Sequence, residues 1–179
     1  MAKLEVHQFP CLSDNYGYLI HDSENNLTAT IDTPEVAPIN KALSEKGWTL
    51  THILNTHHHY DHSGGNLDLK KQWNCTIVGS KRDAERIPGI DEEVDDGDTY
   101  QFGSHTAQVF DVSGHTIGHI AFYFADDADL FSGDALFALG CGRLFEGTPV
   151  QMWDSLQKLA QLPDDTMVYC AHEYTQSNA

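Results

Sequence analysis

The 179-residue chain is predicted to fold as an α+β domain in which two β-sheets pack face to face and helices cover the outside. Short apolar runs of strand length recur in both halves of the chain. Segments with apolar residues at helical spacing lie between them. No linker, repeat or low-complexity stretch interrupts the pattern, so we expect one domain over residues 1–179.

The first half of the chain has short strands with clear boundaries. Strands are expected over residues 4–9, 16–21 and 28–31, with a polar turn over 23–26. Val36, Ile39 and Leu43 have the spacing of one helix face, and Gly47 is a typical helix end. A strand over 51–55, a helix over 65–73 and a strand over 76–79 follow.

The second half is richer in strands. They are expected over residues 99–102, 106–112, 119–125, 129–132 and 167–170. Between the last two, Thr148 is predicted as a helix N-cap, with Pro149 at the first helical position and Gln151 completing a capping box. Pro163 is expected to stop this helix, whose apolar face is Met152, Leu156, Leu159 and Ala160.

The chain is strongly acidic, with 27 Asp and Glu against 10 Lys and Arg and a net charge of −17. This balance argues against nucleic acid or an anionic membrane as a partner. Residues 91–98 carry six carboxylates in eight positions, which fit no EF-hand and are expected to form a solvated loop. Arg143 and Lys158 are the only basic side chains after residue 86.

Location is indicated by the apolar pattern and by the cysteines. No stretch of 18 apolar residues predicts a membrane span, and the N-terminus lacks the apolar core of a secretory signal. Cys11, Cys75, Cys141 and Cys170 are scattered, without a C-x-x-C pair. We therefore expect a cytoplasmic protein with reduced, mostly buried thiols.

A cluster of four histidines and one aspartate within residues 56–62 is the strongest sign of chemistry. Imidazole and carboxylate are the usual ligands of zinc and related divalent ions. His57 and His59 are two apart, so their side chains leave an extended segment on the same face. Asp61 and His62 follow where the chain turns and can address a second point. The spacing predicts a two-metal site rather than a histidine-rich surface tract.

Three further polar residues end apolar segments. His115 lies in a glycine-flanked turn, Asp134 follows a strand and a glycine, and His172 ends the last expected strand. Each alone is more typical of a structural residue. Because strand ends on one rim of a sheet converge in space, the three together with the 56–62 cluster predict one shared site.

This set resembles the metal ligands of the metallo-β-lactamase-fold hydrolases, which implies their four-layer αββα sandwich. More narrowly, the chain resembles glyoxalase II (hydroxyacylglutathione hydrolase), from Asp14-Asn15-Tyr16 near its start almost to its end. The particular motifs are residues 140–148, Gly-Cys-Gly-Arg-Leu-Phe-Glu-Gly-Thr, and residues 172–175, His-Glu-Tyr-Thr.

The resemblance implies two divalent metal ions, with zinc expected and iron or manganese open. The implied ligands are His57, His59 and His115 for the first ion, Asp61, His62 and His172 for the second, and Asp134 for both. Asp61 and Asp134 would also be catalytic, by orienting the hydroxide held between the ions. His58 is expected to point away from the metals, His119 to be structural, and Asp32 to support the site or a turn.

The implied reaction is hydrolysis of S-(2-hydroxyacyl)glutathione, such as S-D-lactoylglutathione, to D-lactate and glutathione, the second step of methylglyoxal detoxification. The implied partner is a small glutathione thioester, and we expect the protein to be a monomer. Substrate contacts are expected from Arg143, Phe145, His172 and Tyr174. A surface role for Arg143, paired with Glu146 or Asp154, stays open.

Two departures from the family leave alternatives open. Ser113-Gly114 precedes His115 where the family has a threonine-proline-glycine turn, and the chain stops before the family's C-terminal helical segment. The alternatives are another hydrolase of this fold (a lactonase, β-lactamase or other thioesterase), a mononuclear iron sulfur dioxygenase, and a non-catalytic metal-binding fragment. Asp134 argues against the common zinc β-lactamases, which have cysteine there, and a complete second ligand set favours hydrolysis over the dioxygenase.

Overall fold

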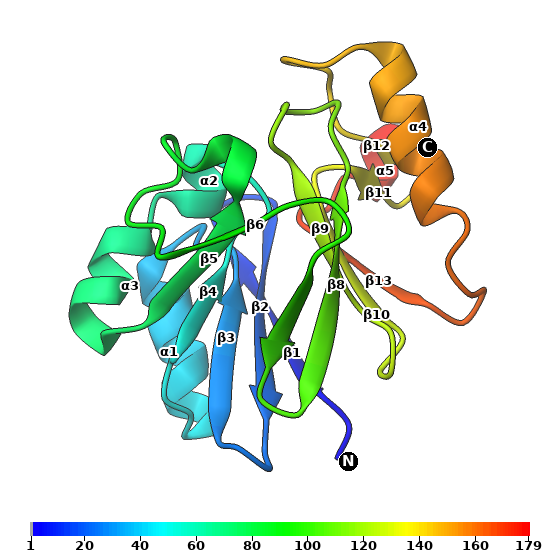
Figure 1. The fold of residues 1–179 in the computed structure, drawn as a ribbon. Helices are drawn as coiled ribbons and strands as arrows, with labels where there is room; N and C mark the ends of the chain where they lie inside the picture. The colour runs from blue at the N-terminus through cyan, green and yellow to red at the C-terminus, as the bar shows by residue number, and fades with distance from the viewer. Residues whose placement is uncertain (1) are drawn as a thin grey trace.

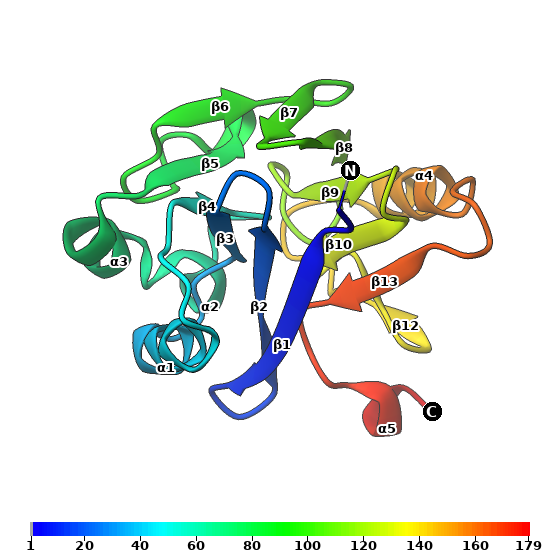
Figure 2. The same ribbon diagram turned by 90° about the horizontal axis from the view of Figure 1, so that it is seen from below.

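The computed structural model describes residues 2–179, and these residues form the four predicted layers of helix, sheet, sheet and helix (Figure 1 and Figure 2). The first sheet has six strands that lie side by side in chain order. The first three are antiparallel and the next three continue in parallel. They are β1 (Glu5–Cys11), β2 (Asn15–Asp22), β3 (Leu27–Ile31), β4 (His52–Leu54), β5 (Thr76–Ser80) and β6 (Glu92–Val94).

The second sheet has five strands in the order β13-β10-β9-β8-β7. All neighbours are antiparallel except β10 and β13. The strands are β7 (Thr99–Phe102), β8 (His105–Asp111), β9 (Ile120–Phe124), β10 (Asp129–Gly133) and β13 (Met167–Cys170). A small hairpin of β11 (Leu136–Phe137) and β12 (Gly140–Cys141) follows β10.

The main core lies between the sheets, because both present an apolar face there. Leu54 and Val78 of the first sheet belong to one buried cluster with Phe102, Phe122 and Phe131 of the second. Burying these large side chains supplies the main drive for the sheets to pack. The two halves of the chain thus share one core.

Helices cover the outer face of each sheet. On the first sheet, α1 (Val36–Lys46) and α3 (Asn66–Trp73) bury Ile39, Leu43 and Leu69. On the second, α4 (Pro149–Leu159) buries Leu159. Two helices of four residues, α2 (Tyr60–Ser63) and α5 (Thr175–Asn178), and a 3₁₀ turn over Lys81–Asp83 complete the described elements. No helix in residues 2–179 combines the length and apolar character needed to span a bilayer.

The predicted helix ends are confirmed. Gly47 ends α1 in the left-handed conformation at φ +69°, and Thr148 forms both hydrogen bonds of the capping box with Gln151. The helix that begins there ends at Leu159, before Pro163.

Several local predictions were wrong. Part of the acidic segment forms β6 rather than a loop: it pairs with β5, exposes its two glutamates and buries Val94 between the sheets. The strand lies at the edge of the first sheet, where both glutamates stay exposed, so their carboxylates are tolerated. Elements α2 and α5 and the β11–β12 hairpin were not expected. Only Cys11 and Cys75 are buried, and Cys141 is exposed.

The Asp22 carboxylate ties the two sheets together at the end of β2. The side chain accepts hydrogen bonds from the backbone N–H of Glu24 and Asn25 and from the Asn25 amide within its own turn. It also accepts from the N–H and hydroxyl of Ser104, in the β7–β8 turn of the second sheet. Burial raises the pKa of Asp22, but these donors outweigh it and hold the pKa below its ordinary value.

Replacing Asp22 by alanine should destabilise the fold by about 3 kcal/mol, because a buried carboxylate that accepts several hydrogen bonds and joins the two sheets is lost. Urea unfolding of both proteins at neutral pH measures the difference, with exposed Asp126→Ala as the control. A carboxyl pKa that is lower in the folded state stabilises above the unfolded pKa and loses this contribution as pH falls. The difference should therefore shrink below pH 3.8, the ordinary value for aspartate. A difference that is small at neutral pH, or that grows in acid, would contradict this role.

Candidate metal centre

All seven predicted ligands meet where the two sheets come together at one end of the sandwich. The loop that follows β4, with α2, carries the first four, and the second sheet supplies the other three from the β8–β9 connection and the ends of β10 and β13. Side chains of both sheets therefore contribute, and only the packed sandwich brings them together. The seven are His57, His59, Asp61, His62, His115, Asp134 and His172.

His57, His59 and His115 form one group, whose potential ligand atoms lie within 4.8 Å of one another. Nδ1 of His59 lies 3.2 Å from Nε2 of His57 and 3.1 Å from Nε2 of His115. His57 is fully buried and His115 nearly so. Three imidazole nitrogens thus face one point, as a zinc-type site requires.

Asp61, His62 and His172 form a second group of the same compactness. Oδ2 of Asp61 lies 3.4 Å from Nε2 of both histidines, and the two Nε2 atoms are 3.3 Å apart. The Asp61 side chain is 38% exposed, whereas His62 is 1% exposed. The carboxylate therefore forms the open side of this group.

Asp134 lies between the groups and turns one oxygen to each. Its Oδ2 is 3.3 Å from Nε2 of His115, and its Oδ1 is 3.4 Å from Nε2 of His62 and 3.3 Å from Nε2 of His172. Oδ1 is buried and accepts no hydrogen bond in the described chain. A buried carboxylate oxygen without a donor is costly unless a cation satisfies it.

The outer hydrogen bonds show which ring nitrogens face the centre with a lone pair. A ring nitrogen that faces an acceptor carries the proton of a neutral imidazole, so the other nitrogen is free to bind a cation. Nδ1 is held in this way in four histidines: His57 by the Thr56 hydroxyl, His62 by Asp32, His115 by the Arg143 carbonyl and His172 by Asp14. With the imidazoles neutral, lone pairs and carboxylate oxygens therefore converge, and this donor set fits two divalent metal ions.

Charge makes the second group the more attractive to a cation. Burial alone lowers the pKa of His62 and His172, but the carboxylates outweigh it. Asp134 and Asp32 raise the pKa of His62, and Asp134 and Asp61 raise that of His172 to about 10. Burial lowers the pKa of all three histidines of the first group. A metal ion bound by the second group would take the place of the proton that the carboxylates otherwise hold there.

Asp32 fixes the start of residues 56–62, here called the histidine loop. Its carboxylate accepts from the Thr56 N–H and hydroxyl, both at 2.7 Å, and from Nδ1 of His62 at 2.8 Å. Asp32 itself lies at φ +59°, a left-handed conformation that costs energy in a residue other than glycine. The hydrogen bonds to Thr56 and His62 hold this buried residue in its strained conformation. Asp32 therefore supports the site, as expected.

Two close approaches around Asp134 require glycine. A Cβ at Gly133, which has φ +52°, would lie 2.7 Å from both Thr56 Oγ1 and the His119 ring. A Cβ at Gly142 would lie 2.0 Å from the Asp134 carbonyl. His119 is buried, and its Nε2 accepts from the Asp134 N–H at 2.9 Å, so it holds the backbone of Asp134 as a structural residue.

An open cavity of about 620 Å³, a size typical of small-molecule sites, lies over both groups. All four predicted substrate residues line it: Arg143, Phe145, His172 and Tyr174. Phe145 packs edge-on to His59 and His115, and Tyr174 stacks on His172 with ring centroids 4.9 Å apart. Among residues 2–179 Arg143 forms no ion pair, since Glu146 pairs with Arg86 instead.

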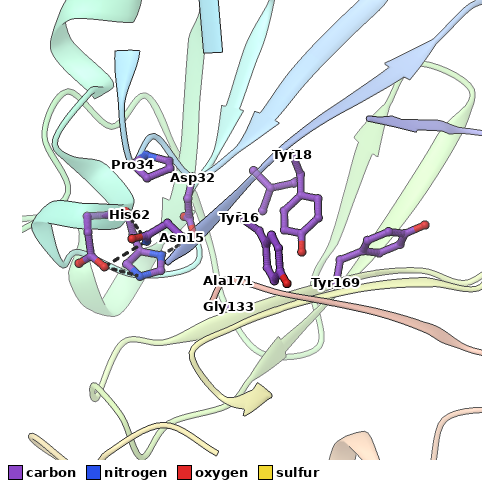
Figure 3. A pocket seen from close by; sticks show the side chains of 11 residues that line it. Asn15, Tyr16, Tyr18, Asp32, Pro34, His62, Gly133, Tyr169 and Ala171 are labelled. Atoms are coloured by element: carbon purple, nitrogen blue, oxygen red, sulfur yellow. Dashed lines mark hydrogen bonds and ion pairs between the residues drawn. The ribbon is translucent and has the colours of Figure 1, made fainter. Parts of the chain in front are cut away.

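A second, much smaller cavity of about 10 Å³ lies behind His62, between the sheets (Figure 3). Asn15, Asp32 and Tyr18 line it with His62. Its volume is at the lower limit for one water molecule, so it cannot take a substrate.

Several residues that support the centre were not predicted from the sequence. Asp14 lies 3.0 Å from Nδ1 of His172, and Asn15 donates to Oδ2 of Asp61 at 3.2 Å. Asp14 ends the turn before β2 and Asn15 begins the strand, which meets the segment after β13 at an isolated bridge between Asn15 and His172. Asp83 holds His58, which points away from the centre as expected. The Asp14-Asn15-Tyr16 motif was the only signal available for the first two.

Replacing Asp32 by asparagine should lower metal affinity about 10- to 100-fold, because a donating NH2 group replaces one of the two oxygens that accept from Thr56 and His62. The competition of the apoprotein with a chromogenic zinc chelator measures this. Asp127→Asn is a matched control, since Asp127 is another buried carboxylate that pairs with a histidine, His105, away from the centre. The control should lose stability but keep metal affinity. Equal metal affinity in both variants would argue against this role for Asp32.

Comparison with known proteins agrees with this architecture. The family model of the metallo-β-lactamase superfamily matches residues 27–172. A curated relative named hydroxyacylglutathione hydrolase, from Maricaulis maris, is 54% identical over 179 residues, which are 100% of this chain and 70% of the relative.

Solved structures show the same fold. ETHE1 from Myxococcus xanthus has a TM-score of 0.84 and 34% identity, over 95% of this chain and 76% of its own. TTHA1623, solved in a di-iron-bound form, has a TM-score of 0.79 and 26% identity, over 94% of this chain and 92% of its own. Taken together with the ligand geometry, these matches identify the chain as a member of the metallo-β-lactamase superfamily and, within it, of the hydroxyacylglutathione hydrolase family.

Proposed function

We propose that this protein hydrolyses thioesters of glutathione with 2-hydroxy acids, such as S-D-lactoylglutathione, in the second step of methylglyoxal detoxification. The observation that carries the proposal is the convergence of imidazole lone pairs and carboxylate oxygens on both sides of Asp134. The substrate class is supported by the name of the relatives, hydroxyacylglutathione hydrolase. The cavity over the centre is large enough for such a ligand.

We further propose which residues hold the two ions. The first ion would be held by His57, His59 and His115, the second by Asp61, His62 and His172, with Asp134 shared. Zinc is the proposed metal, since mixed imidazole and carboxylate ligands suit it. Two such ions, when bound, lower the pKa of a water molecule and polarise the substrate carbonyl.

The carboxylates of the centre would position the reacting water. Asp61 lines the cavity with a partly exposed side chain, and Asp134 faces both groups. Their oxygens can accept hydrogen bonds from a water molecule and so direct its lone pair at the thioester carbon. The leaving group is a thiolate whose thiol pKa is about 8.5, so it departs without a strong general acid.

The walls of the cavity would bind the substrate. Glutathione carries two carboxylates, and the protein has a net charge of −17, so a local cation is needed. Arg143 is unpaired within the described chain and lines the cavity. Phe145 and Tyr174 add apolar walls beside the histidines.

Residues 1–179 are proposed to act as one catalytic domain, monomeric and cytoplasmic. The shared core between the sheets supports the single domain. The four free cysteines, one of them exposed, suit a reducing compartment.

The proposal is tested by steady-state hydrolysis of S-D-lactoylglutathione, followed by thiol release, with metal content measured on the same sample. We expect turnover with two ions per chain. Asp134→Asn should lose both metal and turnover, because one neutral amide replaces the shared carboxylate. Asp127→Asn, the distant aspartate control, should keep both.

Two bound ions without thioester hydrolysis would overturn the proposed function and leave a metal-binding protein. Full occupancy of both ions in Asp134→Asn would contradict the shared position of that carboxylate.

Arg143→Ala should raise KM for the glutathione thioester about tenfold, since an interaction with a charged group is lost. A small neutral thioester should be hydrolysed with unchanged KM, and Arg143→Lys should recover part of the loss. Initial rates over a range of both substrates measure this. An equal effect of Arg143→Ala on the two thioesters would rule out a glutathione contact.

A further inference from the structure

A chain of charged side chains runs along the outside of the metal centre. It begins at Asp83, whose side chain is 0% exposed. Oδ2 of Asp83 lies 2.8 Å from Nδ1 of His58, the residue between two predicted ligands of the first group. Oδ1 accepts from Arg86, through Nε at 3.1 Å and through Nη2. One buried carboxylate thus holds both the histidine loop and an arginine.

Arg86 carries the connection to the loop that lines the cavity. Its Nη1 donates to Oε1 of Glu146 at 2.5 Å and its Nη2 donates to Oε2 at 3.2 Å. The Ile117 N–H also donates to Oε2, at 2.8 Å. The bond from Arg86 is the main reason that the pKa of Glu146 is lowered to about 2, so this carboxylate stays ionised.

Glu146 belongs to residues 142–147, here called the cavity loop, which carries Arg143 and Phe145. Two hydrogen bonds attach the loop to the turn around His115. Nδ1 of His115 lies 2.8 Å from the Arg143 carbonyl, and the N–H of Gly147 donates to the Gly114 carbonyl at 3.0 Å. The Glu146 side chain adds a further anchor, through its ion pair with Arg86. The cavity loop is therefore attached to the 81–86 segment as well as to its own neighbours.

The packing around Asp83 leaves the network little freedom. A Cβ at Gly118 would lie 2.2 Å from the Asp83 carboxylate, so this backbone passes directly against the buried charge. Removing one partner of a buried carboxylate leaves an uncompensated charge, which is far more costly than losing a surface pair. The two-point contact of Arg86 with Glu146 also fixes direction, which a single contact does not.

We propose that Asp83 and Arg86 are positioning residues that hold the histidine loop, through His58, and the cavity loop, through Glu146, in one fixed relative placement. The substrate-binding side chains then stay aligned with the first histidine group. This inference rests on the proposed thioester hydrolysis for its effect on KM, but the coupling of the two loops does not depend on any reaction.

The test replaces Arg86 by methionine, which keeps the aliphatic length and removes the charge. Amide hydrogen exchange of residues 142–147 should become about tenfold faster, because the loop loses its anchor and opens locally. KM for S-D-lactoylglutathione should rise about tenfold, with kcat and metal content unchanged. Arg82→Met is the matched control: Arg82 belongs to the same segment and pairs with Asp111 and Asp95 on the surface. The control should change none of these quantities.

Glu146→Gln and the double variant Arg86→Met/Glu146→Gln complete a cycle. If the two residues act through each other, the double variant should exchange no faster than either single variant. Additive effects, or unchanged exchange in Arg86→Met, would overturn the proposal. If the unaltered protein does not hydrolyse the thioester, the proposed function fails, while the exchange measurement still decides the coupling.

Discussion

The carboxylate of Asp32 is the constraint on which the metal centre depends. It accepts hydrogen bonds from the N–H and the hydroxyl of Thr56 and from the ring of His62. It therefore joins the end of β3 to the start and the end of the histidine loop. To do so it occupies a left-handed conformation at φ +59°. Such strain persists only where the surroundings determine the position from several sides. The same arrangement recurs in His57, His62, His115 and His172. In each, an acceptor outside the centre binds Nδ1 and so directs the lone pair of Nε2 into the centre.

The location of the centre follows from the packing of the sheets. The first sheet supplies a loop with three histidine ligands and one carboxylate ligand. The second supplies one ligand from the β8–β9 connection and two from the ends of β10 and β13. Asp134 faces both groups, so it depends on the sheets meeting in the right register. The apolar core between the sheets stabilises this packing, and so do the hydrogen bonds between Asp22 and Ser104 at the other end of β2. The contacts that stabilise the sandwich therefore also set the geometry of the site.

Much of this was accessible from the sequence because the signals are local. The spacing of His57 and His59, the capping box at Thr148 and the end of α1 at Gly47 each lie within a few residues. Local signals failed for β6, where pairing with β5 and burial of Val94 outweigh the charge of its neighbours. They also failed for the link from Asp83 to Glu146, which joins segments about 60 residues apart. Such contacts exist only in the folded chain.

We propose that Asp134 is shared by two ions. Crystals grown with zinc and measured on both sides of the zinc absorption edge test it most directly. We expect two anomalous peaks, each in contact with an oxygen of Asp134. One should lie beside His57, His59 and His115, and the other beside Asp61, His62 and His172. A single peak at full occupancy, or two peaks of which only one contacts Asp134, would contradict it.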